Sequence, residues 1–293
     1  MNSILQYPKS VQRRFFDYLY VEYSKRAYVS PDPIEILYTY NNTAEREIAG
    51  FLTASLALGR AGLITRTAQL LLNRLPSPLT DIQYMNKTDI QKAVNGLYYR
   101  FFSEHHLSGI VYGLSNILKK YGSLESAFEA KFYKNNNDIH KTLIQVTMEL
   151  IGYSGPLGIL IPDPRKQSSC KRLYLFFRWM IRNDKIDPGG WSFISPSKLI
   201  LPLDTHMLRV AKQLGITKKN QASITAAREI THFFSGICPE DPVKYDFALT
   251  RFGIHPDLNY ETLKKMYTQP QNNTGILNGT FRIAENNILY SIV

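Results

Sequence analysis

The sequence predicts an all-α protein, and three features support this prediction. Apolar residues recur at helical spacing in the segments 44–58 and 88–102, and the second places Leu97 and Phe101 on its apolar face. Residues that favour helix ends follow one another along most of the chain. The alternation of apolar and polar residues that is typical of half-buried strands is nearly absent.

Individual residues predict where helices begin and end. Gly122 is typical of the position just after a helix, and Ser123 is a good cap for the helix that follows. Asn137 or Asp138 is expected to cap a third helix. Asp241 precedes a proline, a combination that favours another helix start.

Two segments interrupt this helical pattern. Residues 153–169 and 184–203 are rich in proline and glycine. Both are long for plain connections, so we expect them to contribute to function. The tail from Gln269 onward is rich in asparagine and lacks helical periodicity, which predicts a loosely attached segment.

The charge balance favours a polyanionic partner. The chain has 35 lysines and arginines against 24 acidic residues, a net charge of +11. Neutralising phosphates releases counterions, so such a protein gains affinity for nucleic acid. A basic protein without that partner would have the same charge, so the count alone barely separates the alternatives. The 19 tyrosines and 15 phenylalanines fit either a large core or stacking on bases.

The cysteine count and the hydropathy exclude several protein classes. Cys170 and Cys238 are too few for a disulfide framework, a four-cysteine zinc site or a four-cysteine iron–sulfur cluster, so we expect no metal and no cofactor. A reducing cytoplasm is the simplest location. The first residues, MNSILQYPKSVQRRFF, lack the apolar core of a signal peptide. No segment approaches the roughly 20 apolar residues that span a bilayer, so we expect no membrane association.

Residues 201–215, LPLDTHMLRVAKQLG, are the most informative segment. Asp204 is placed to cap a helix with an apolar face that includes Met207 and Val210, and Gly215 follows that helix. Capping alone would explain an aspartate here. His206 has three interpretations: it touches a phosphate, orients the Asp204 carboxylate or forms a local hydrogen bond.

A basic stretch lies upstream of this segment. Residues 165–182, RKQSSCKRLYLFFRWMIR, contain six basic residues and no acidic one. Ser168 or Ser169 is expected to cap a helix with one apolar face, which places Lys171 in the first turn. A cation there opposes the helix dipole and Arg172 is adjacent, so both effects favour a neutral, nucleophilic amine. The alternative is that Lys171 is one surface lysine among many.

The string from Leu201 to Gly215 resembles the signature of the helix-hairpin-helix DNA glycosylase superfamily. In that family the aspartate that matches Asp204 is the catalytic carboxylate. Members that also cut the strand have a nucleophilic lysine at an upstream helix start, which Lys171 matches best. The separation of 33 residues between the two resembles the divergent archaeal branch that removes 8-oxoguanine. No Leu-Pro-Gly-x-Gly hairpin precedes Lys171, and the whole chain also looks like an uncharacterised bacterial family with the same core.

This resemblance implies a two-lobed helical fold with the active site in the cleft between the lobes. One lobe would comprise residues 45–185, and the other residues 1–44 together with 186–293. The implied activity is a DNA repair glycosylase, with or without strand cleavage, acting as a monomer on a damaged base, such as an oxidised purine, flipped out of duplex DNA. Two alternatives remain: a catalytically silent DNA-binding protein of the same fold, and an enzyme that acts on RNA or nucleotides.

Five residues are the candidate DNA contacts: Arg60, Lys166, Ser169, Arg172 and His206. The segment GFLTASLALGRAG resembles the early helix of the superfamily whose following turn enters DNA. Arg60 is therefore a candidate to fill the gap left by an extruded base, and a solvated arginine after a helix end is the alternative. Lys166 is also the competing candidate for the nucleophile.

Overall fold

The computed structural model describes residues 3–268, 280–281 and 290–291, and nearly all of its regular structure is helical. The predicted all-α class is confirmed. The exception is a short antiparallel ladder of β1 (Thr280–Phe281) and β2 (Tyr290–Ser291), in which Thr280 lies opposite Ser291. Most of the tail for which loose attachment was predicted lies outside the described residues. Among the described helices, none is long and apolar enough to cross a membrane.

Twelve α-helices and five short 3-10 helices are described. The α-helices are α1 (Lys9–Tyr23), α2 (Thr43–Ser55), α3 (Ala61–Leu72), α4 (Lys87–Val94), α5 (Glu104–Tyr121), α6 (Leu124–Lys134), α7 (Ile139–Ser154), α8 (Lys171–Ile181), α9 (Thr205–Gln213), α10 (Ile224–Ser235), α11 (Asp246–Ile254) and α12 (Tyr260–Thr268). The 3-10 helices are η1 (Ile4–Gln6), η2 (Arg26–Tyr28), η3 (Pro33–Thr39), η4 (Leu79–Tyr84) and η5 (Pro196–Lys198).

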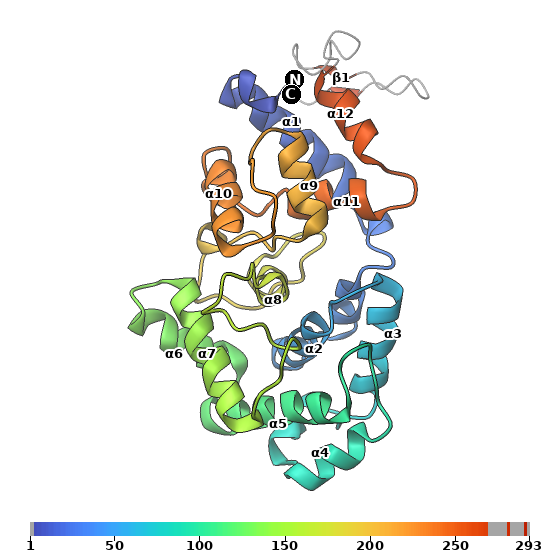
Figure 1. Cartoon of the computed structure of the whole chain (residues 1–293), viewed down its shortest axis with the longest axis vertical. Coiled ribbons are helices and arrows are strands. Elements are labelled where there is room, and N and C mark those ends of the chain that lie inside the picture. The colour runs from blue at the N-terminus through green and yellow to red at the C-terminus, as the bar shows by residue number, and fades with distance from the viewer. Residues whose placement is uncertain (1–2, 269–279, 282–289, 292–293) are drawn as a thin grey trace.

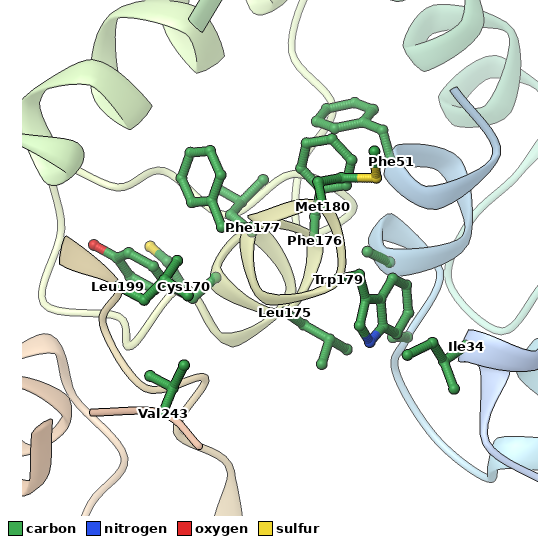
Figure 2. Close-up of a cluster of buried hydrophobic side chains, with 14 of the residues drawn as sticks. Ile34, Phe51, Cys170, Leu175, Phe176, Phe177, Trp179, Met180, Leu199 and Val243 are labelled. Carbon is green, nitrogen blue, oxygen red and sulfur yellow. The ribbon is translucent and has the colours of Figure 1, made fainter. Parts of the chain in front are cut away.

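Helix α8 is the centre of the molecule. The residues expected on its buried face are buried, and so is every other side chain from residue 173 to 181. Figure 2 shows Phe177 and Trp179 projecting from opposite sides of α8. The ring of Phe176 lies 5.4 Å from that of Phe51 in α2. A helix that is surrounded by other elements has no face in contact with solvent, which explains why apolar residues occur on all its sides.

The other helices form two groups, one on each side of α8 (Figure 1). Helices α1, α9, α10, α11 and α12 lie on one side, where α11 packs against both α1 and α9. Helices α2 to α7 lie on the other side, where α5 packs against α4, α6 and α7, and α2 packs against α8. The segment η3 contacts α2 and α3. Residues 33–39 therefore lie with the helices expected in the first lobe.

Three predicted helix ends are confirmed. Gly122 follows α5 with a φ of +81°, a backbone conformation that glycine adopts without strain. The side chain of Ser123 accepts a hydrogen bond from the amide of Ser126 and so caps α6. Asp138, the second of the two candidates, caps α7 by accepting from the amides of His140 and Lys141.

The predicted helix over 88–102 is wrong beyond Val94. Helix α4 ends at Val94, and Gly96 follows with a φ of +74°. The Asn-Gly pair stops the helix because glycine adopts this left-handed conformation at little cost. Phe101, expected on the buried face, is 63% exposed. The apolar residues keep a helical spacing beyond this point, although the Asn-Gly pair already indicated the end of the helix.

The predicted helix start at Asp241 is also wrong. Helix α11 begins five residues later, at Asp246. The Asp241 carboxylate instead accepts a hydrogen bond of 2.8 Å from Nε of Arg182. An ion pair with a distant part of the chain decides the role of this aspartate.

Candidate active site

The first residue of α8 and the residue that precedes α9 bring the two expected catalytic side chains together. Lys171 is the first residue of α8, as predicted, and Asp204 is the N-cap of α9. The Nζ atom of Lys171 lies 3.3 Å from Oδ2 of Asp204. The lysine side chain is 32% exposed and the aspartate side chain 17%. Both are therefore partly shielded from water and still reachable from the surface.

Asp204 has two roles at once. Its Oδ1 atom accepts a hydrogen bond of 2.8 Å from the amide of Met207, which is the predicted helix cap. Its Oδ2 atom is left to face the amine of Lys171. Because the cap fixes one oxygen, the backbone of α9 determines the direction in which the other points. The carboxylate is held in place as a proton acceptor or as a negative charge beside the amine.

The expected serine cap of α8 is wrong. Cys170 occupies the N-cap position with a φ of +48°, and no side chain caps the helix. Ser169 is 7% exposed, and its hydroxyl donates a hydrogen bond of 2.9 Å to the carbonyl oxygen of Leu203. This places Ser169 in the interior, where it connects the two segments that lead into Lys171 and Asp204. The hydroxyl that was expected to contact DNA therefore bonds to a carbonyl oxygen inside the protein.

Arg172 also points into the structure. Its guanidinium donates to the carbonyl oxygens of Ser55 at 2.7 Å and Leu160 at 3.1 Å, and to that of Ile159. Burial lowers the pKa of Arg172 to about 10. The side chain joins the start of α8 to the end of α2, so backbone carbonyl oxygens accept hydrogen bonds from the guanidinium that was expected to contact a phosphate. The charged group beside the amine of Lys171 is therefore the Asp204 carboxylate, which can accept the proton of the amine.

Most of the remaining positive charge of the stretch 165–182 is neutralised by acidic residues that lie outside the stretch. Arg178 and Arg182 are each 4% exposed. Their partners are Asp184, Asp187, Asp241 and Asp246. Arg165 binds Asp163 at 2.8 Å. The stretch itself contains no acidic residue, so the sequence suggested more free positive charge for a ligand than the structure leaves. Lys166 is exposed.

Asp246 is a buried carboxylate whose charge interacts with that of Asp204. Burial raises its pKa, the Arg178 guanidinium opposes this rise, and the negative charge of Asp204 adds to it. Its Oδ1 atom is buried and has no hydrogen-bond partner in the structure. The interior behind Asp204 is therefore acidic, and Arg178 is the cation that compensates it.

His206 and Arg60 lie in different surroundings. His206 Nδ1 lies 3.0 Å from the hydroxyl of Tyr260 in α12, so the histidine forms a tertiary hydrogen bond and does not orient the Asp204 carboxylate. Arg60 is exposed in the turn between α2 and α3 and immediately precedes α3, which has no side-chain cap. Of the five candidate DNA contacts, Arg60 and Lys166 are the two that the structure exposes.

Sequence reasoning missed a tight turn beside Arg60. Tyr99 and Phe102 exchange backbone hydrogen bonds of 2.9 and 2.8 Å, which leaves Arg100 and Phe101 as a two-residue turn. The hydroxyl of Tyr99 donates to the carbonyl oxygen of Leu58 at 2.8 Å, so this turn is anchored to the segment that follows α2. The Asn-Gly pair at 95–96 was the signal that could have separated this segment from the preceding helix.

Two surface hollows lie elsewhere. One lies between α4 and α5 and is lined in part by Lys92, Glu104 and His105. The other is lined in part by Lys218 and Glu229. Neither is lined by the lysine–aspartate pair, so neither is a candidate base pocket for it.

Comparison with known proteins gives one match. A family model with the description "Protein of unknown function (DUF2400)" matches residues 32–255. No curated protein and no solved structure matches the chain. The matched span includes Lys171, Asp204 and the turn at Arg100. It ends before α12, so the partner of His206 lies outside it.

Proposed function

The chain belongs to the family described as protein of unknown function (DUF2400), and we propose that it is a DNA glycosylase that excises a damaged base from duplex DNA. The observation that carries this proposal is the distance of 3.3 Å between Lys171 Nζ and Asp204 Oδ2, two residues that lie 33 positions apart. An amine beside a fixed carboxylate, both partly exposed, can act as a nucleophile with its general base. The resemblance of residues 201–215 to the glycosylase signature supports the same chemistry.

In this mechanism Asp204 accepts a proton from the Lys171 ammonium, and the neutral amine attacks C1′ of the damaged nucleotide. The C1′–N bond to the base breaks, and the base leaves with the bonding electrons and takes up a proton. Opening of the sugar ring and loss of a further amine proton give a Schiff base between Nζ and C1′. Loss of a proton from C2′ and elimination of the 3′ phosphate then form the C2′=C3′ double bond and cut the strand, and water releases the lysine.

We infer from the arrangement of the helices where DNA binds relative to Lys171 and Asp204. In our proposal the helices on the two sides of α8 form two lobes, and the pair at the start of α8 and α9 lies between them. Duplex DNA would contact the exposed Arg60 and Lys166, with the extruded nucleotide directed at Lys171. An oxidised purine is the first substrate to test, and one protein molecule acts on one duplex.

A panel of duplexes, each with a single damaged base, tests the proposal. Wild-type protein should release one base and become trapped on that duplex by borohydride, which reduces the Schiff base. Lys171→Gln should abolish trapping, because glutamine has no primary amine, and DNA binding should largely remain. Lys166→Gln is the control for the competing lysine: it keeps the Lys171 amine, so trapping should remain at a protein concentration that saturates the duplex.

Three outcomes would overturn parts of this proposal. Binding to duplex DNA without release of any base would indicate a DNA-binding protein without catalysis. Activity on RNA or free nucleotides, with none on duplex DNA, would assign a different substrate. Base release without trapping in the wild type would remove the lysine chemistry and leave a hydrolytic role for Asp204.

A further inference from the structure

The turn at Arg100 and Phe101 presents an aromatic ring to solvent although the residues on either side are buried. Tyr99 and Phe102 are 3% and 0% exposed, and Phe101 between them is 63% exposed. Tyr98, the residue before this turn, is 70% exposed. Two large aromatic side chains, three positions apart in the sequence, are thus exposed to solvent, where they gain nothing from burial. Such a group of exposed rings needs a partner more than a single exposed ring does.

The backbone of the turn is strained. Arg100 has a φ of +53°, in the left-handed region that glycine and asparagine adopt more readily. This conformation is unfavourable for a residue with a side chain, because its Cβ atom comes too close to the following carbonyl oxygen. Strained residues of this kind concentrate at binding sites, where the surrounding structure holds them in place. The turn thus keeps an arginine where a glycine would relieve the strain.

Contacts with α2 and α8 connect this turn to the lysine–aspartate pair. The guanidinium carbon of Arg172, the residue after Lys171, lies 6.0 Å from the ring of Phe102. The same guanidinium donates to the carbonyl oxygen of Ser55 at the end of α2. The side chains of Arg100 and Tyr99 are the nearest atoms that a Cβ atom on Gly59 would meet, so this turn lies against the segment that follows α2. The aromatic tip is therefore held at a fixed position relative to Lys171.

The charges around the tip favour a nucleic acid. The guanidinium carbon of Arg100 lies 5.5 Å from the ring of Phe101, and the exposed Arg60 lies in the neighbouring turn. The one acid in the adjoining segment, Glu104, accepts a hydrogen bond of 2.7 Å from the amide of Gly96. An aromatic ring beside arginines is the combination that stacks on a base while it neutralises a phosphate. An apolar protein surface would leave both guanidinium groups without a counterion.

We propose that the Arg100–Phe101 turn binds DNA by stacking the Phe101 ring on a nucleobase that has lost its neighbour, with Arg100 on the adjacent phosphate. This inference rests on the proposed function for the DNA partner, because a base removed from the duplex at Lys171 leaves such an unstacked neighbour. It assigns stacking to Phe101, whereas the sequence pointed to Arg60 for this role.

The test compares the binding of the full-length variants Phe101→Ala and Phe101→Trp to a duplex that contains a single tetrahydrofuran abasic analogue. Stacking on one base contributes roughly 5- to 150-fold in affinity, so Phe101→Ala should lose an amount in this range. Phe101→Trp should restore it, because indole also stacks. Tyr133→Ala, at a 58% exposed aromatic residue of α6, is the matched control and should bind like the wild type. Thermal unfolding should be unchanged in all three variants, since the replaced side chains are largely exposed.

The failures of the two proposals are distinguishable. If wild-type protein is trapped on a lesion and Phe101→Ala binds the abasic duplex as well as Tyr133→Ala does, stacking by Phe101 is overturned and the glycosylase assignment stands. If no lesion duplex traps the wild type and Phe101→Ala still loses affinity that Phe101→Trp restores, stacking stands without lysine chemistry. Wild-type protein that binds neither the abasic duplex nor single-stranded DNA overturns both.

Discussion

The hydroxyl of Ser169 donates a hydrogen bond to the carbonyl oxygen of Leu203, and both residues are buried. Ser169 lies two residues before Lys171, and Leu203 lies one residue before Asp204. This single bond therefore joins the two segments that enter α8 and α9. It accounts for how two side chains from different parts of the chain come within 3.3 Å of each other.

Ser169→Ala should reduce base excision more than it reduces DNA binding. The change leaves the buried carbonyl of Leu203 without its donor and should lower the free energy of unfolding by about 1 to 3 kcal/mol. The start of α8 can then shift relative to Asp204, so the single-turnover rate should fall. Ser235→Ala removes an exposed hydroxyl that also donates to a carbonyl, at 2.8 Å, and should change neither quantity. An unchanged excision rate in Ser169→Ala would show that the bond does not position the pair.

Asp204→Asn should separate the two roles of this residue. Asparagine caps helices as well as aspartate does, so the melting temperature should stay close to that of the wild type. The variant lacks a carboxylate to accept the lysine proton, and we expect the excision rate to fall by about 100-fold or more. Thermal unfolding and single-turnover excision measure the two effects. Full activity with asparagine would mean that Asp204 is only a cap.

Arg172→Ala should affect mainly stability, and Lys166→Ala should affect mainly DNA binding. The first removes the donor for three backbone carbonyls and should lower the free energy of unfolding by about 1 to 3 kcal/mol. The second alters an exposed side chain and should leave stability within about 0.5 kcal/mol. Lys166→Ala should instead weaken duplex binding equally across sequences and reduce the salt slope by about 1. Chemical denaturation and salt titrations of binding distinguish these results. A stable Arg172→Ala protein with weak DNA binding would restore the phosphate contact to Arg172.

Glu47 should make stability depend on pH. Burial raises its pKa to about 7, although the amides of Leu124 and Glu125 and the indole of Trp191 donate hydrogen bonds to the carboxylate. In the unfolded chain a glutamate titrates near 4.3. Between these values the folded state binds the extra proton, so this contribution to stability is present below about pH 4 and is lost as pH rises through 7. Glu47→Gln removes this titration.

The measurement for Glu47 is denaturant unfolding of both proteins between pH 5 and pH 8. The wild type should exceed Glu47→Gln in stability by more at pH 5 than at pH 8. Glu45→Gln, at a half-buried acid of the same helix that accepts from the amide of Leu79, is the control for helix α2. A difference between wild type and Glu47→Gln that stays constant with pH would contradict the raised pKa.

The sequence by itself determined the features that depend on neighbouring residues. It predicted the all-α class, because helical spacing and capping residues act within a few positions of one another. It placed Lys171 in the first turn of α8 and the cap of α9 at Asp204, and both are found in the structure, although the residue that precedes α8 is Cys170 and not a serine. The Asn-Gly pair at 95–96 carried the local information that ends α4, although the apolar spacing predicted otherwise.

Only the tertiary structure decided which charges are free and which side chains meet. Arg172, Arg178 and Arg182 look like a phosphate-binding surface in the sequence, and carbonyls and carboxylates from distant segments bind all three. The exposed ring of Phe101 and the distance from Lys171 to Asp204 were likewise outside the reach of local patterns. The physical reason is that a buried charge must find a partner wherever the fold brings one, and sequence spacing does not encode which distant groups become neighbours.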